Sequence, residues 1–280
     1  MTEPTSAPIV LVHGAWHGSW CWSGIAPQIA AAGRSSVAVD MEGHGMDAVP
    51  LASALARPFD AAAFATERSP HAGVTLASAA RRLIGQIESV GRPVVLVAHS
   101  MSGHVVSAAA QAAPQLVERL VYVTGFMAAS GQPAGGYIQS SENAGELIGP
   151  LIVADPAAVG ALRLDVGSPD EAYRAGLRDA LYGDVAPALA DATIRLLSSD
   201  CPFGIPVGVT DLTREGWGSI PRLYVRCAQD RAILPALQSR FIAEADAAFP
   251  GNPTRVIDLD TSHSPFLSQP DQVASAILGA

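Results

Sequence analysis

The stretch PVVLVAHSMSG, residues 93–103, decides the fold because it joins an apolar strand to a helix through a serine. The run 93–98 is mostly Val, Leu and Ala, as expected for a strand covered on both faces of a parallel sheet. Ser100 follows this run, and small residues open the helix expected over 102–113. A serine on such a tight turn is lifted above the sheet edge. We therefore expect a nucleophile elbow at Ser100.

Both glycines of the usual GxSxG form of this turn are replaced. Ala98 lies two residues before the serine and Ser102 two after it, with Gly103 one place later. The small size that the close approach of strand and helix requires is kept, although the literal motif is not. A serine between a strand and a helix also commonly serves only as a helix cap. On the local sequence alone, both interpretations of Ser100 stay open.

Outward from this turn, short β-rich runs alternate with alanine-rich segments. This alternation is typical of a mostly parallel sheet with helices on both faces, so the fold class is α/β. Strands are expected at 8–12, 36–40, 93–98, 120–124, 222–227 and 255–259, about six in all. Helices are expected at 23–32, 76–90, 102–113, 237–248 and 272–278.

The alternation breaks down between residues 130 and 218. Gly and Pro there punctuate short helical stretches, of which 157–164 and 171–182 are examples. We interpret residues 130–218 as an insertion into one core made of residues 1–129 and 219–280. A second irregular stretch, 46–73, is longer than most connections of its kind and is a candidate border of a ligand site.

Composition narrows the class of partner. The 280 residues carry a formal net charge of −9 with only 17 Lys and Arg, which argues against a nucleic-acid ligand. The amino-terminal residues have no signal-peptide pattern and no apolar run is long enough to span a membrane, so we expect a cytoplasmic protein. Three widely spaced cysteines, without histidines at zinc-binding spacing, predict free thiols and no metal site.

A second motif, VLVHGAWHG at residues 10–18, complements the serine turn. Acyl transfer needs two backbone N–H groups aimed at the developing oxyanion, one after the nucleophile and one from the loop after the first strand. Ala15 and Met101 occupy those positions. His13 lies too near this loop to serve as a base, and we interpret it as structural. The same interpretation applies to three further histidines, His17, His44 and His99.

The third signal lies near the carboxyl end of the chain. Asp230 follows the run RLYVRCAQ, and His263 follows VIDLDTS, so each comes just after an expected strand. A base must reach the serine from the carboxyl edge of the sheet, and a buried carboxylate must orient it. The order Ser100, Asp230, His263 is that of the α/β-hydrolases. Asp258 and Asp260 compete as the acid, with less suitable positions on the strand.

The segments HGAWHGSWCW, AHSMSG, YVRCAQD and SHSPF resemble the methylesterase and hydroxynitrile lyase branch of the α/β-hydrolase superfamily. The resemblance spans nearly the whole chain. It implies an α/β-hydrolase fold in which an inserted helical cap covers the pocket, and residues 130–218 match that cap by position. It also implies a catalytic triad of Ser100, Asp230 and His263 with no cofactor.

Within that branch, the lyases typically carry an acidic residue before the nucleophile, a threonine in the oxyanion loop and a lysine after the histidine. This chain has His99, Gly14 and Ser264 at those places. The departures favour the esterase side, because a lyase needs a cation near the departing cyanide. The expected activity is hydrolysis of a small carboxylic ester or lactone through an acyl-enzyme. A lyase-type reaction and a non-catalytic ligand receptor remain the alternatives.

The expected substrate is a small-molecule ester with an apolar acyl part. Aromatic and long apolar residues near the site or in the insertion are candidates for the lining of its pocket. These are Trp16, Phe126, Met127, Tyr137, Phe203 and Trp217. We expect about two of the last five to touch ligand and the others to pack the insertion against the sheet.

Overall fold

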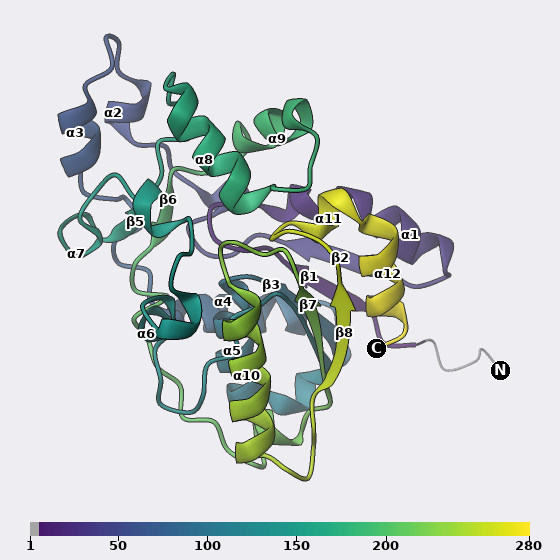
Figure 1. Cartoon of the computed structure of the whole chain (residues 1–280). Coiled ribbons are helices and arrows are strands. Elements are labelled where there is room, and N and C mark those ends of the chain that lie inside the picture. Colours follow the sequence, from purple (N-terminus) through teal and green to yellow (C-terminus); the bar gives the residue numbers. More distant parts are fainter. Residues whose placement is uncertain (1–5) are drawn as a thin grey trace.

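The computed structural model describes residues 6–280 (Figure 1). Residues 1–5, which belong to the amino-terminal stretch where we expect no signal peptide, lie outside the described residues. Its central sheet has six strands in the order β2-β1-β3-β4-β7-β8, and every neighbouring pair is parallel. The strands are β1 (Ile9–Val12), β2 (Ser36–Val39), β3 (Val94–His99), β4 (Val117–Val123), β7 (Arg222–Cys227) and β8 (Arg255–Leu259). The predicted parallel sheet is confirmed, and β7 and β8 have the predicted bounds.

Helices cover both faces of the sheet (Figure 1). One face carries α1 (Ala26–Ala31), α11 (Pro265–Ser268) and α12 (Pro270–Leu278), and the other carries α4 (Leu76–Glu88), α5 (Ser102–Ala112) and α10 (Pro235–Ala248). Successive side chains of a strand point to opposite faces. In β1, Ile9 and Leu11 therefore pack in the first layer, and Val10 and Val12 in the second. Burial of each such side chain contributes ~1.5–3 kcal/mol to folding.

The strand order reverses between β1 and β3. From β1 the chain proceeds outward to β2, and β3 then returns to the other side of β1. In parallel α/β sheets, ligands bind beyond the carboxyl ends of the strands at such a reversal. The loops that follow β1 and β3 begin at His13 and Ser100, so the topology places both sequence motifs at this position.

Most of segment 130–218 lies beyond the carboxyl ends of the sheet strands (Figure 1), and its last residues run back beside α5 to the start of β7. It contains α6 (Ala134–Ile138), α7 (Pro156–Val159), β5 (Ala161–Arg163), α8 (Glu171–Leu181), α9 (Pro187–Ile194) and β6 (Asp200–Pro202). β5 and β6 pair antiparallel in a sheet of their own. The fully buried Arg163 pairs with Asp200 at 2.7 Å and donates to the carbonyl groups of Phe64 and Glu67. Through these two carbonyl bonds Arg163 joins the small sheet to stretch 46–73.

Several predicted helices differ in detail. The helix expected over 157–164 is wrong beyond its first turn, because Gly160 adopts a left-handed φ of 78° that ends α7 and leads into β5. The helix expected over 23–32 starts only at Ala26, where Pro27 fits the first turn. Stretch 46–73 contains α2 (Ala52–Leu55) and α3 (Ala61–Thr66). Short 3-10 helices occupy Ser19–Gly24, Gly45–Asp47, Pro114–Leu116, Ser141–Asn143, Gly149–Leu151 and Trp217–Ser219.

Candidate active site

Ser100 stands at the turn between β3 and α5 with a positive φ of 55°, which is uncommon for a residue other than glycine. Two glycines permit this turn. A Cβ on Gly14 would lie 2.7 Å from Ser100 Cβ, and one on Gly103 would lie 2.5 Å from the Phe126 carbonyl oxygen. The Ser100 carbonyl in turn accepts a hydrogen bond from the Phe126 N–H. The strained serine is therefore held by backbone on both sides.

Ser102 has a structural role at the position where the usual motif has glycine. Its hydroxyl donates toward the carbonyl groups of Val12, at 3.0 Å, and His99, at 2.8 Å, and it accepts from the His99 N–H at 3.0 Å. These bonds tie the ends of β1 and β3 together. The departure from GxSxG thus adds an anchor to the elbow, and Gly103 provides the close approach of the helix.

The structure brings Ser100, His263 and Asp230 into one hydrogen-bonded chain. His263 Nε2 lies 2.9 Å from Ser100 Oγ, and His263 Nδ1 lies 2.7 Å from Asp230 Oδ2. All three side chains are buried. Because the carboxylate accepts the Nδ1 proton, Nε2 is free to accept a proton from the serine hydroxyl. This is the geometry of a nucleophile with a general base.

Asp230 is fully engaged in the site. Its Oδ1 accepts from the N–H groups of Ala232 and Ile233 at 2.7 and 2.9 Å, and its Oδ2 accepts from the Thr124 hydroxyl as well as from His263. Four donors meet the needs of a buried carboxylate. Thr124, at the end of β4, is a site residue that the sequence motifs did not indicate.

The two competing aspartates lie elsewhere. Asp258 forms a two-pronged pair with Arg226 at 2.6 and 3.0 Å, and its side chain is 59% exposed. Asp260 accepts from the side chain of Gln229 at 2.7 Å. Neither carboxylate contacts His263 in the described part of the chain, so the geometry selects Asp230 as its partner.

Ala15 and Met101 border the same cavity as Ser100 and His263. Within residues 6–280, neither N–H has a hydrogen-bond partner of its own. Trp16, next to Ala15, has a left-handed φ of 62° and is held from segment 130–218. Its indole N–H donates to the Leu162 carbonyl at 2.9 Å, and its carbonyl accepts from the Ser198 N–H at 2.8 Å. Unpaired backbone donors on two residues that line the cavity beside Ser100 are groups of the kind that can bind an oxyanion.

Four other histidines are buried near the site but hold structural positions. Burial lowers the pKa of His13 and of His17 to about 3 and that of His44 to about 4, so all three are neutral. Burial, followed by the neighbouring His263, also lowers the pKa of His99. His13 Nδ1 bonds to the Gly14 carbonyl and its Nε2 accepts from the Met41 N–H. No contact in the described residues places His13, His17 or His44 beside the serine hydroxyl.

A cavity of roughly 100 Å³ lies over Ser100 and opens to solvent. Its wall is almost wholly apolar, and Glu146 is the one acidic side chain on it among the described residues. The lining comprises Ala15, Trp16, Ser100, Met101, Phe126, Ile138, Glu146, Ile148, Gly149, Ile152, Leu162, Leu181, Ala232, Ile233 and His263. An apolar wall with a few convergent polar groups is typical of a small-molecule site.

Of the six proposed lining residues, Trp16 and Phe126 border this cavity and four do not. Tyr137 packs on Phe241 and its hydroxyl donates to Glu244. Trp217 donates to the Tyr122 hydroxyl at 2.7 Å. Met127 is buried in the core, and Phe203 lies beside β6, where its N–H bonds to the Gly160 carbonyl. Most of the wall instead comes from aliphatic residues that no motif marks.

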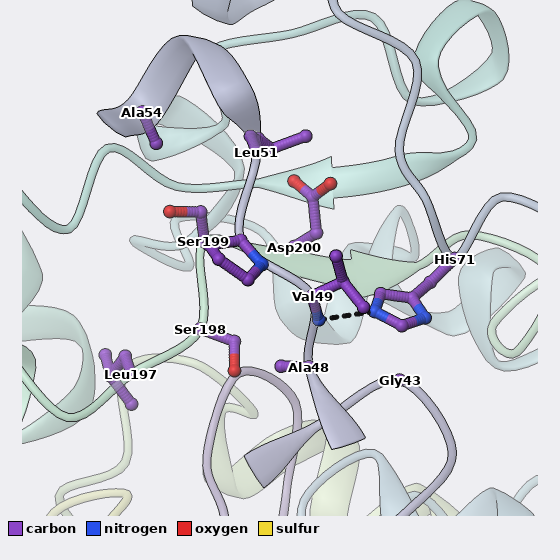
Figure 2. A pocket seen from close by; sticks show the side chains of 11 residues that line it. Gly43, Ala48, Val49, Leu51, Ala54, His71, Leu197, Ser198, Ser199 and Asp200 are labelled. Atoms are coloured by element: carbon purple, nitrogen blue, oxygen red, sulfur yellow. Dashed lines mark hydrogen bonds between the residues drawn. The ribbon is translucent and has the colours of Figure 1, made fainter. Parts of the chain in front are cut away.

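A second cleft lies between stretch 46–73 and residues 197–200, away from the triad (Figure 2). Leu51, Ala54 and Leu197 contribute apolar groups to it, and the Val49 N–H donates to His71 at 2.8 Å. Its Asp200 is already paired with Arg163. The charge in this cleft therefore stabilises the fold.

Metal and thiol chemistry find no support among the described residues. No group of three or more His, Cys, Asp or Glu side chains in residues 6–280 is placed to hold a metal ion. Cys21, Cys201 and Cys227 are buried free thiols, and burial raises the pKa of each. In the same part of the chain, no helix has the length and apolar character needed to cross a membrane.

Comparison with known proteins identifies the family of this chain. A family model described as alpha/beta hydrolase family matches residues 9–276. Methylesterase 7 of Arabidopsis thaliana is 27% identical over 99% of this chain and 97% of its own length. A pyrethroid hydrolase of Sphingobium wenxiniae is also 27% identical, over 98% of this chain and 87% of its own. The solved structure of a pyrethroid hydrolase from Sphingobium faniae superposes with a TM-score of 0.72 at 24% identity, covering 98% and 96% of the two chains.

Proposed function

Because this chain belongs to the alpha/beta hydrolase family, we propose that it hydrolyses carboxylic esters with Ser100 as nucleophile, His263 as general base and Asp230 as its orienting acid. The observation that carries the proposal is the hydrogen-bonded chain from Ser100 Oγ through the imidazole to Asp230, with links of 2.9 and 2.7 Å. Ester hydrolysis is also the kind of reaction that the names of the methylesterase and pyrethroid hydrolase relatives describe.

The reaction has two halves. The Ser100 oxygen attacks the ester carbonyl carbon as His263 Nε2 takes its proton. The tetrahedral intermediate collapses, and the departing alcohol oxygen receives that proton from the imidazole. Water then attacks the acyl-enzyme with His263 again accepting a proton, and collapse releases the acid and restores the serine. No cofactor enters either half.

The N–H groups of Ala15 and Met101 hold the negative oxygen in both tetrahedral intermediates. In sites of this kind each such donor contributes about 3 kcal/mol to lowering the barrier. This role is supported by two observations: Ala15 and Met101 line the cavity beside Ser100, and neither backbone N–H has a partner among the described residues. Donors fixed in the backbone cost no reorganisation when the charge develops.

Segment 130–218 acts as the cap of this site. Ile138, Ile148, Ile152, Leu162 and Leu181 all come from it and form much of the apolar wall. They favour a neutral ester with an apolar acyl or alcohol part. Glu146 disfavours a substrate that carries a second, negatively charged group, because like charges in a partly enclosed site repel.

A lyase reaction on the same triad has less support. Departure of cyanide requires a cation nearby, and the cavity wall in the described part of the chain contains no Arg or Lys. A receptor without catalysis would have no need of an intact hydrogen-bonded triad. The wall and the triad together therefore favour ester hydrolysis over both alternatives.

Turnover of p-nitrophenyl esters of graded acyl length by the wild-type chain and by Ser100→Ala tests the proposal. We expect hydrolysis by the wild type and a loss of kcat of at least ~10³-fold in the variant. Far-UV circular dichroism checks that the variant is folded. Equal turnover by the two proteins would contradict a serine nucleophile.

A further inference from the structure

The loop that carries His263 is held from above by a carboxylate of segment 130–218. Asp184 lies just beyond the end of α8, and its Oδ2 accepts from the Thr261 hydroxyl at 2.6 Å. Its Oδ1 accepts from the hydroxyl of Ser262, the residue directly before His263. From below, His99 Nε2 donates to the His263 carbonyl at 2.8 Å. The histidine loop is thus anchored on both sides, by the core and by the insertion.

The anchoring carboxylate has no cation to compensate it. Among the described residues, Asp184 takes part in no ion pair. Burial raises the pKa of Asp184, but the Ser262 and Thr261 hydroxyls outweigh that effect, and the net pKa is lowered. A partly buried carboxylate without hydrogen-bond donors costs free energy, so Asp184 must stay beside the two hydroxyls that donate to it. The position of the loop and the position of the end of α8 therefore depend on each other.

Two residues earlier, Tyr182 reaches the other reactive loop. Its hydroxyl lies 2.9 Å from His17 Nε2, and His17 Nδ1 lies 2.8 Å from the Ala15 carbonyl. Burial lowers the pKa of His17 to about 3 and raises the pKa of Tyr182. The imidazole is therefore neutral and the phenol protonated, so Tyr182 donates to His17 and His17 donates to Ala15. This chain of bonds ends on Ala15, which lines the cavity over Ser100.

We propose that the end of α8 positions both reactive loops, with Asp184 holding the histidine loop and Tyr182 holding the oxyanion loop through His17. Leu181, the last residue of α8, borders the cavity itself. A substrate that packs against Leu181 therefore contacts the element that sets the geometry of both loops. Asp184 and Tyr182 are positioning residues, because neither borders the cavity over Ser100. The inference rests on the proposed function, since it concerns the same serine and histidine.

The test uses Asp184→Ala, Asp184→Asn and Tyr182→Phe in the full chain. Two matched controls change the same kinds of group inside the insertion. Tyr173→Phe removes a hydroxyl that donates to the Leu151 carbonyl, and Asp191→Asn removes a carboxylate that pairs with Arg178. For each protein we would measure kcat and KM with p-nitrophenyl butyrate, the rate of inactivation by a small p-nitrophenyl phosphonate, and the thermal unfolding midpoint.

Misplaced catalytic groups lower the rate of the chemical step more than they weaken substrate binding. We expect Asp184→Ala to lower kcat by roughly 10–30-fold and Tyr182→Phe by roughly 3–10-fold, each with KM changed less than about twofold. The phosphonate rate should fall in parallel. Asp184→Asn, whose amide oxygen still accepts one hydroxyl, should retain more activity than Asp184→Ala. Both controls should stay within about twofold of wild type.

Three outcomes would overturn the inference. One is that kcat of the Asp184 and Tyr182 variants matches that of the controls while the wild type is active, which leaves the proposed function standing. Another is a rise in KM at constant kcat, which would indicate substrate binding instead of positioning. The third is a wild-type chain that neither turns over esters nor reacts with the phosphonate, which would remove the proposed function as well. If Asp184→Ala does not fold, Tyr182→Phe, which loses one oxygen atom, still decides.

Discussion

Different interactions dominate the two sides of the cavity over Ser100, hydrogen bonds on one side and apolar contacts on the other. The side formed by the sheet core carries the reacting polar groups, since Ser100 and His263 border the cavity and hydrogen bonds join them to Asp230 and Thr124. The side formed by segment 130–218 is mainly aliphatic. Hydrogen bonds restrict direction as well as distance, whereas apolar contacts depend mainly on buried area. A substitution of a hydrogen-bonded residue on the core side should therefore change the rate of the chemistry, and one of an aliphatic lining residue on the other side should change substrate preference.

The largest expected effect separates two aspartates of the core. Asp230→Asn should lower kcat by roughly 10³–10⁴-fold, because an amide cannot hold His263 in the tautomer that accepts the serine proton. Asp258→Asn is the matched control, since Asp258 is bound to Arg226 and largely exposed. Its kcat should stay within a few-fold of wild type when ester turnover is measured. Equal losses in the two variants would remove Asp230 from the triad.

A smaller effect is expected on the apolar side. Ile152→Ala removes aliphatic surface from the cavity wall, and we expect kcat/KM for a short acyl ester to fall by ~3–10-fold, mainly through KM. Longer acyl chains should lose less, because they fill the space that the change creates. Leu196→Ala removes equal bulk from an exposed site in the same segment and is the control. A change in kcat without a change in acyl-length preference would contradict the statement that the aliphatic lining residues of segment 130–218 set substrate preference.

Low pH should act on the sheet core through its histidines, because all seven histidines of the chain lie outside segment 130–218. Burial lowers the pKa of His13 and His17 to about 3 and of His44 to about 4 in the folded state. The unfolded chain binds these protons below about pH 6.5, and the folded chain does not until pH is much lower. Stability should thus be full above pH 6.5 and fall as pH drops toward 4, by up to ~1.4 kcal/mol per histidine per pH unit.

The thermal unfolding midpoint measured between pH 8 and pH 4 checks this expectation. A midpoint that holds constant down to pH 4 would show that the buried histidines bind protons in the folded protein. His44→Gln should flatten the curve, because it removes one of the groups whose folded and unfolded pKa values differ.

The sequence predicts the strands of the central sheet better than it predicts the short strands of segment 130–218. Strands β7 and β8 match residue for residue, because a proline, Pro221 or Pro253, lies just before each β-rich run and polar residues follow it. β4 begins three residues earlier than expected, at Val117, since Glu118 and Arg119 make its first part look like a loop. The antiparallel pair of β5 and β6 was missed because each strand has only three residues, too few to show a period of two.

The candidate site divides in the same way. Ser100, Asp230 and His263 each follow a strand, so strand order and residue type indicate them. Ile148 and Ile152 lie in irregular backbone, where no periodicity shows which side chain faces the serine. Tyr137 and Trp217 drew attention as large aromatics, but their polar atoms are bound to Glu244 and Tyr122 outside the cavity wall. Contacts of that kind depend on residues far away in the chain and cannot be read from local sequence.

Covalent labelling of the wild-type chain with a p-nitrophenyl organophosphonate, followed by peptide mapping of the adduct, tests most directly whether Ser100 is the nucleophile. Reaction should release one equivalent of p-nitrophenol, place the phosphonyl group on the Ser100 oxygen and abolish ester turnover in step with labelling. Labelling at another residue with Ser100 unmodified, or turnover that survives complete modification of Ser100, would contradict a serine hydrolase built on this elbow.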